Sequence, residues 1–298
     1  MHHAPLPARD PGSLTSRISP EDLRLGLVYV AVHVAASFAS AAARAPASPE
    51  MAVWHSTTGL ALSLFFLRGV RMVWAMATAI LVTLVISSRP FGGPTLRELV
   101  PVVVMTAVGV GTVKVLQRAG RFDPAKPIRI GFLAAIALVV PAVYLVFYRA
   151  LAPSLSMTDL LHVWLAQASA ALAILPFAVV FSDRLPRALG GAIWHSDGDA
   201  GDRIAPWVWP LVAIAMFGLS VADVHPVMAE VRTSYLMLIP IAWMALRFGL
   251  RGAVGTVLIG NVVYLVAMAT VATTGDAFEY QVFLLGGNLA GLLIGALA

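Results

Sequence analysis

Histidines and carboxylates stand at the ends of several apolar stretches of this chain. The set consists of His55, Asp159, His162, Asp223, His225 and Glu230. Imidazoles and carboxylates bind divalent metals, and histidine also changes its charge between about pH 5 and 8. No two of these histidines have a metal-binding spacing on one helix. The pattern therefore predicts a site that binds a ligand or exchanges protons. Alternatively, these residues occur here only because the membrane interface is hydrated.

Tryptophans accompany the histidines and complete the predicted ligand site. The candidate residues are His55, His162, Asp223 and His225, with Trp54, Trp164 and Trp243 lining a pocket. A small-molecule ligand is expected there, but the residue types identify no particular ligand, metal or cofactor.

Other polar residues lie deep within apolar stretches, namely His33, Gln167, Asn261 and Asn288. His33 is interpreted either as a proton-responsive switch or metal or haem ligand, or as a neutral imidazole bonded to a backbone carbonyl or a neighbouring asparagine. The three amides are expected to make interhelical hydrogen bonds, worth about 0.6–2 kcal/mol each.

The elements that carry these residues are predicted to cross a membrane. The chain is 59% hydrophobic and only 12% charged, and about 20 apolar residues span a bilayer core. We expect an all-α, polytopic transmembrane helical bundle of about ten spans, or eight if the short ones are re-entrant. The expected spans are 23–43, 51–67, 72–87, 96–117, 128–150, 158–181, 207–224, 231–247, 252–273 and 279–298.

The basic residues predict the orientation of the bundle. Of the 20 Lys and Arg, only Arg44, Arg89, Arg97, Arg149 and Arg232 fall on one side of the alternating loops. Basic residues are retained in the cytoplasm during insertion. We therefore expect both termini to be cytoplasmic, with a tail at 1–22 and an integral membrane domain at 23–298.

Two short turns on the basic side look alike. Each combines glycine with two arginines, in Arg68, Gly69 and Arg71, and in Arg247, Gly249 and Arg251. Glycine permits a tight turn, and the arginines suit the headgroup layer. The likeness fits a weak internal duplication or the ordinary composition of short inner loops.

Motifs of enzymes are largely missing. No zinc-protease helix, serine elbow or phosphate-binding glycine loop is found, so no catalytic activity is expected. The chain contains no cysteine, and the net charge of +5 reflects inner-leaflet topology. The lipid bilayer is the expected partner, and nucleic acid is not.

Three strings of the chain resemble the membrane-associated sensor domain, type one (MASE family). They are WHSTTGLAL at 54–62 followed by LRGVR at 67–71, VWLAQASAALAILP at 163–176, and YLMLIPIAW at 235–243 followed by RFGLRGA at 247–253. Ser56 and Thr57 replace the family's prolines, Gln167 its aspartate, and Ala170 its glycine.

The resemblance implies a multi-pass sensor in a bacterial inner membrane. Such domains are normally fused to a histidine kinase of a two-component system or to a cyclic-di-GMP enzyme, through which a homodimer forms. The chain stops within apolar sequence at Ala298, and we expect the output domain to follow it. The alternative function is a small-solute transporter or channel, for which His33, Asn261 and Asn288 are compatible midplane residues.

Overall fold

The computed structural model describes most of the apolar part of the chain. The described residues are 18–42, 54–87, 103–104, 106–112, 114–115, 127–151, 156–181, 204–224, 234–270 and 277–298. Every regular element in these ranges is helical, which confirms the all-α prediction. His225 and Glu230 of the predicted site lie outside them.

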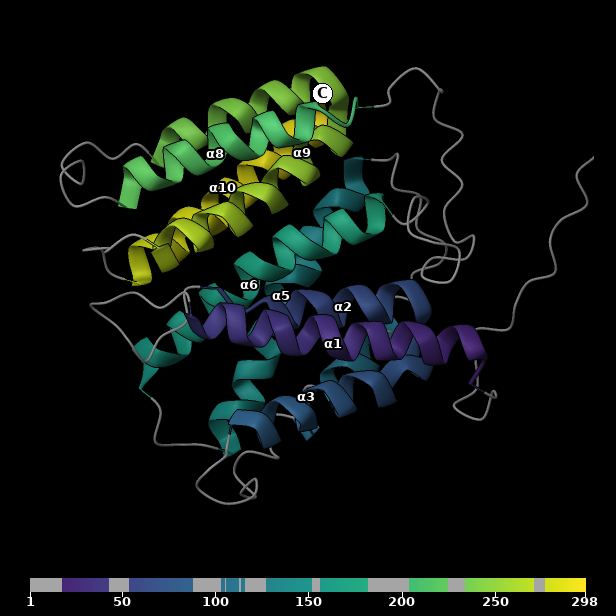
Figure 1. Cartoon of the computed structure of the whole chain (residues 1–298). Helices are drawn as coiled ribbons and strands as arrows, with labels where there is room; N and C mark the ends of the chain where they lie inside the picture. Colours follow the sequence, from purple (N-terminus) through teal and green to yellow (C-terminus); the bar gives the residue numbers. More distant parts are fainter. Residues whose placement is uncertain are drawn as a thin grey trace, which may run out of the picture.

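The helices run nearly side by side and form one bundle (Figure 1). In chain order they are α1 (Pro20–Ala42), α2 (Ser56–Arg68), α3 (Val73–Ser87), α5 (Pro127–Leu151), α6 (Met157–Val180), α8 (Val208–Val224), α9 (Leu238–Thr270) and α10 (Ala277–Leu297), with 3-10 turns at Val70–Met72 and Ser234–Met237. Residues 103–104, 106–112 and 114–115 are also helical.

The expected count of about ten spans is not confirmed. In the described part, five helices are long and apolar enough to cross a membrane, and Val70–Ile86 and Val208–Asp223 are shorter apolar helices. α2 has only 13 residues, fewer than the roughly 20 that a full crossing needs. The expected span 96–117 is described only in part.

α9 contains two of the expected spans, joined by a sharp turn. Gly249 has φ 58° and ψ −150°, a non-helical conformation that interrupts the helix. A Cβ placed on Gly291 of α10 would meet both Ile241 and Val257. Sixteen residues of straight helix would separate those two by about 24 Å, so the chain must fold back at Gly249. α9 is therefore a helical hairpin, and α10 packs against both of its halves.

α6 is the central helix. Its membrane-spanning window is 78% buried, whereas those of α1 and α5 are 28% buried. Ala166, Ala168, Ala170, Ala171 and Ala173 are completely buried. In lipid, small residues let helices approach closely, and this close packing holds a bundle together. The alanines of α6 thus bring α2, α5, α9 and α10 around one axis.

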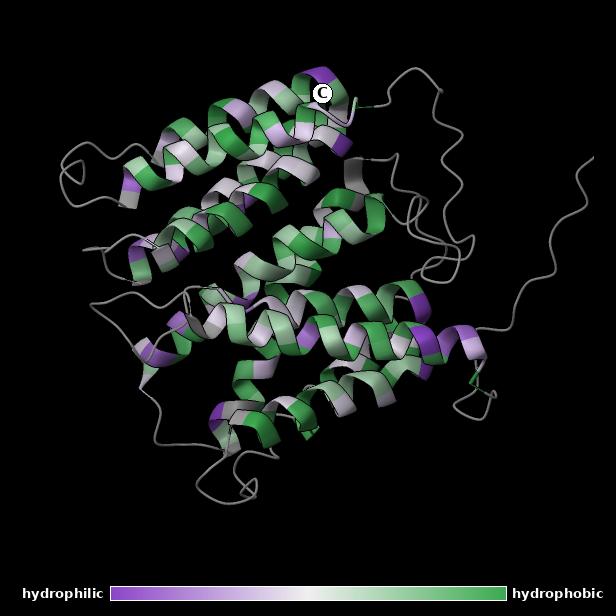
Figure 2. Cartoon of the chain, viewed as in Figure 1, coloured by the Kyte–Doolittle hydropathy of each residue, from purple (hydrophilic) through white to green (hydrophobic). Residues whose placement is uncertain are grey.

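The outside of the bundle is apolar along its middle. Val146, Leu211 and Ile214 are 70%, 56% and 69% exposed. Hydrophobic residues make up most of the helices, and the most hydrophilic ones lie mainly near the helix ends (Figure 2). Lipid is the solvent that such a surface requires. Figure 1 shows the start of α1 and the end of α10 at the same end of the bundle.

Candidate functional site

His162 joins α6 to α10. Its Nδ1 atom lies 2.9 Å from Oε1 of Gln281, and its ring meets the edge of Phe278 with centroids 5.7 Å apart. His162 is 9% exposed and Gln281 is fully buried. A buried hydrogen bond of this kind fixes both side chains, because neither has water as a substitute partner. This contact is the first link between a predicted site residue and the last helix.

Asp223 is connected to the same helix through an aromatic cluster. The Tyr264 hydroxyl of α9 donates to Oδ2 of Asp223 at 2.8 Å. The Tyr264 ring packs against Tyr280 and Phe283 of α10, at centroid distances of 5.8 and 5.5 Å. Tyr280 is the chain neighbour of Gln281, so Asp223 (through Tyr264) and His162 are linked to adjacent residues of α10.

His55 and Trp54 enter the bundle beside the middle of α6. The His55 backbone N–H donates to the Ala166 carbonyl at 3.0 Å, and His55 is half-buried. Trp54 is 6% exposed and packs into the core that α6, α8, α9 and α10 share. Its indole Nε1 makes no hydrogen bond within the described part of the chain.

Gln167, next to that backbone contact, is also incompletely satisfied. It is 6% exposed, and its Oε1 finds no hydrogen-bond partner among the described residues. An unsatisfied buried polar atom costs about 1–3 kcal/mol. Trp54 and Gln167 are the chain neighbours of His55 and Ala166, which are joined by the 3.0 Å backbone hydrogen bond. Each of these two neighbours thus has one buried side-chain atom, a donor on Trp54 and an acceptor on Gln167, that is available to a ligand.

The two predicted midplane asparagines bond to each other. Asn261 Nδ2 donates to Asn288 Oδ1 at 2.6 Å, and Asn288 Nδ2 donates to the Ser169 carbonyl at 2.8 Å. This network ties α9, α10 and α6 together at the level of the core. The sequence prediction that these amides make interhelical hydrogen bonds is confirmed.

We use the term outer cluster for His55, His162, Asp223, Tyr264, Tyr280 and Gln281. No three His, Asp or Glu residues of the described segments are close enough together to hold a metal ion. Asp159 instead closes the start of α6, accepting from the Ser156 hydroxyl at 2.7 Å and the Ser156 N–H at 3.1 Å.

The remaining predicted tryptophans lie in other surroundings. Trp164 donates through Nε1 to the Leu138 carbonyl of α5 at 3.0 Å. Trp243 is 53% exposed and makes an edge contact with Phe248. The structure therefore brings neither of them into the Trp54 environment.

His33 is buried within α1, with 3% exposure. Its Nδ1 lies 3.1 Å from the hydroxyl of Tyr29, one turn earlier. The partner is thus a tyrosine of the same helix rather than the backbone carbonyl or asparagine that we expected. A tyrosine four residues away shares the helix face of His33.

Both predicted glycine turns have the required backbone. Gly69 and Gly249 have φ of 76° and 58°, a region that favours glycine. The surroundings of their arginines differ. Arg68 and Arg71 face Asp22, with Nη1 to carboxylate distances of 3.9 and 3.4 Å, whereas Arg247 is exposed.

Asp22, Tyr264, Tyr280 and Gln281 are functional candidates that the sequence interpretation missed. We assigned Asp22 to the tail, but α1 begins at Pro20, and Asp22 is 1% exposed. Gln281 had a usable signal, because it is an amide close to the start of the last apolar stretch.

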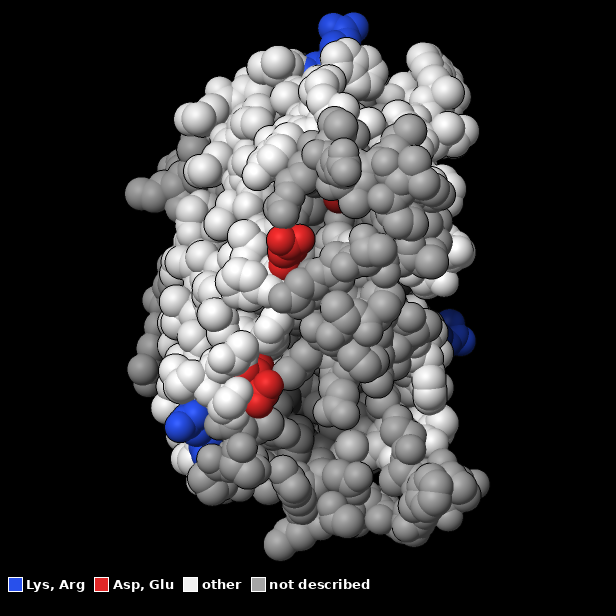
Figure 3. Space-filling view, turned by 90° about the vertical axis from the view of Figure 1, so that its left-hand side faces the viewer, with Lys and Arg blue, Asp and Glu red and all other residues white. Residues whose placement is uncertain are grey.

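One end of the bundle carries acidic residues. Figure 3 views the end that faces left in Figure 1, with acidic side chains near the middle and basic ones at the margins.

A family model, MASE1, matches residues 23–298. Neither a curated protein nor a solved structure matches the chain. The matched range includes every predicted site residue, both glycine turns and the whole of α10. Since the match covers nearly the entire chain, the protein belongs to the MASE1 family of membrane-associated sensor domains.

Proposed function

We propose that this chain is the sensory input domain of a signal-transduction protein in a bacterial inner membrane. The outer cluster receives the stimulus, and α10 carries it to a cytoplasmic output module such as a kinase or a cyclic-di-GMP enzyme. In this proposal the domain itself is not catalytic, both termini are cytoplasmic, and a homodimer forms through the output module.

The observation that carries the proposal is the attachment of α10 at two levels. Gln281 meets His162 near the start of α10, and Asn288, seven residues later, meets Asn261 and the Ser169 carbonyl. Seven residues are about two helical turns, so both amides lie on the same face of α10. A displacement of Gln281 therefore changes the strain on the Asn288 contacts.

The stimulus we propose is a small hydrogen-bonding molecule. Trp54 Nε1 and Gln167 Oε1 have no partner in this packing of the described residues. A molecule with one acceptor and one donor that reaches both atoms satisfies both. Such a ligand shifts the domain only as far as its affinities for two packings differ.

The relay can be tested without knowing the stimulus. The chain has no cysteine of its own, so spin labels attach only to the introduced cysteines of Leu246→Cys and Leu297→Cys. Leu246 and Leu297 are 75% and 84% exposed and lie at the end of the bundle opposite Gln281. Gln281→Leu then replaces the stimulus by breaking the His162 contact. We expect a changed distance distribution between the labels.

Val282→Leu is the matched control. Val282 is the next residue of α10 and is 44% exposed, so the substitution keeps the outer cluster intact and should leave the distribution as it is. Identical distributions in Gln281→Leu, Val282→Leu and the parent protein would mean that α10 does not transmit events at Gln281.

A transporter or channel makes a different prediction for the same protein. Interrupted helices and midplane amides also occur in transporters, and α9 and the Asn261–Asn288 pair fit that description. Uptake of amino acids, sugars or inorganic ions by purified protein in liposomes would favour this second class. A sensor domain should show no uptake above that of empty liposomes.

A further inference from the structure

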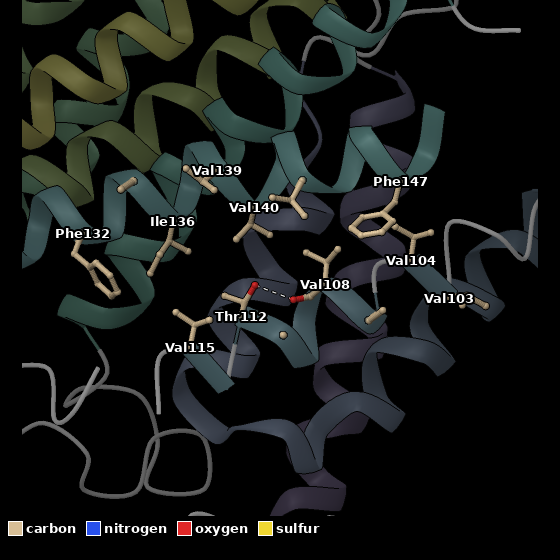
Figure 4. Close-up of a pocket in the computed structure, with 14 residues that line it drawn as sticks. Val103, Val104, Val108, Thr112, Val115, Phe132, Ile136, Val139, Val140 and Phe147 are labelled. Carbon is tan, nitrogen blue, oxygen red and sulfur yellow. Dashed lines mark hydrogen bonds between the residues drawn. The ribbon is translucent and has the colours of Figure 1, made fainter. Parts of the chain in front are cut away.

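A long apolar groove lies between α5 and the helical residues 103–104, 106–112 and 114–115. Figure 4 shows side chains of both helices turned toward a shared space, with Phe132 at one end and Phe147 at the other. Its volume is about 680 Å³, which is within the range of ligand sites, roughly 300–1,000 Å³. Nothing in the outer cluster or in the relay through α10 uses this groove.

The lining excludes water as the normal occupant. Among the described residues that line it, Thr112 is the only one with a polar side chain, and its hydroxyl donates to the Val108 carbonyl at 2.8 Å. A buried water needs about two to four polar partners. The groove therefore takes an apolar molecule.

The length of the groove indicates that this apolar molecule is an extended chain. Its lining extends along α5 from Phe132 to Phe147 and along the other helix from Val103 to Val115. At 1.5 Å per residue these stretches are about 22 and 18 Å long. One leaflet of the hydrocarbon core is about 15 Å thick, so a single extended acyl chain fits along the groove.

The groove opens to the bilayer rather than to water. Val139 and Phe147 of its rim are 56% and 54% exposed, and they belong to the span Ile130–Phe147, which has a mean hydropathy of 2.6. An occupant therefore enters sideways from the lipid.

Small residues give the groove its depth. A Cβ on Gly111 would have no atom within 4 Å, whereas a Cβ on Gly109 would meet the Phe65 ring of α2. Gly109 thus serves the packing of the helix onto α2, while Gly111 leaves space on the groove side of the helix. Ala107 and Ala135 are further small residues of the lining.

We propose that this groove is a lipid site that retains one acyl chain of a membrane phospholipid. The inference depends on the membrane location of the helices and is independent of the proposed sensing function. A retained chain fills the space between the two helices and holds residues 103–115 at their distance from α5.

The test uses a phosphatidylglycerol with a photoreactive diazirine in its acyl chain, reconstituted with the full chain in phosphatidylethanolamine vesicles. After illumination, adducts are located by peptide mass spectrometry. We expect adducts within 103–115 and 132–147 that saturate at one per chain, above the level on the exposed residues Leu211 and Ile214 of α8.

Gly111→Leu places a large side chain in the lining of the groove and should reduce those adducts at least fivefold. Gly131→Leu is the matched control, because a Cβ there also meets no atom within 4 Å and Gly131 does not line the groove. If Gly111→Leu does not fold, Ala135→Leu takes its place. Labelling that follows exposure alone, or that is unchanged in the filled variants, would leave only annular lipid and overturn the proposal.

Discussion

Nδ1 of His162 lies 2.9 Å from Oε1 of Gln281, although the two residues are 119 positions apart. This contact connects the central helix to the last one next to the place where Tyr264, which donates to Asp223 of α8, packs against Tyr280 of α10. His162 and Tyr264 of the outer cluster are therefore in direct contact with α10, so a movement of either side chain acts on that helix.

The first prediction concerns the strength of this contact. We expect a double-mutant cycle of His162→Leu and Gln281→Leu to give a coupling of about 0.6–2 kcal/mol, because interhelical hydrogen bonds in membranes have that size. Unfolding in detergent, followed by circular dichroism, measures it. A coupling of zero would show that the two side chains do not stabilise each other.

The second prediction compares the two asparagines. Asn288 donates to the Ser169 carbonyl of α6 and accepts from Asn261, whereas Asn261 also donates to Val257 of its own helix. Asn288→Leu should therefore lower the free energy of unfolding by about 1–3 kcal/mol, and more than Asn261→Leu does. The reverse order would show that α6 gains nothing from Asn288.

The third prediction concerns Asp22, the buried carboxylate that faces Arg68 and Arg71. Asp22→Asn removes its charge while Arg68, 6% exposed at its side chain, stays buried. Breaking a buried ion pair costs about 3–5 kcal/mol, and we expect the lower end because Arg71 is 35% exposed. Thermal unfolding in detergent measures the loss.

Glu21→Gln is the control for Asp22→Asn, since Glu21 is the preceding residue and is exposed. It should change the stability by less than about 0.5 kcal/mol, as surface substitutions usually do. Equal effects of the two substitutions would assign the loss to net charge rather than to the buried contact.

The fourth prediction tests the two glycine turns. Gly69→Ala and Gly249→Ala place a Cβ at φ of 76° and 58° with ψ of −170° and −150°, a backbone region that is essentially limited to glycine and costs other residues about 1–3 kcal/mol. Gly218→Ala in α8 is the control, because its Cβ would meet nothing and alanine favours helix by about 1 kcal/mol. Unfolding measurements that rank all three alike would contradict the turn assignment.

Some features of the fold follow directly from composition and spacing. Long apolar stretches predicted helices, and glycine between arginines predicted the turns at Gly69 and Gly249. The burial of Gln167, Asn261 and Asn288 also followed, because an amide in an apolar stretch must face other helices rather than lipid.

Other features depend on how the helices are rotated and placed against one another, which spacing along one helix does not determine. Gln281 as the partner of His162 belongs to this group, as does the aromatic link from Asp223 through Tyr264. The burial of Asp22 was missed because a carboxylate beside a polar tail is usually solvated. The short α2 and the hairpin within α9 explain why a count of apolar stretches differs from the number of long helices.

The measurement that tests the whole account most directly is the sidedness of the two ends of the bundle. Met157 is 70% exposed at the start of α6, beside the outer cluster, and Arg247 lies at the Gly249 turn. Met157→Cys and Arg247→Cys are treated with a membrane-impermeant maleimide on intact cells, before and after permeabilisation. We predict that Met157→Cys reacts in intact cells and that Arg247→Cys reacts only after permeabilisation; the opposite pattern would place the outer cluster in the cytoplasm and contradict the account.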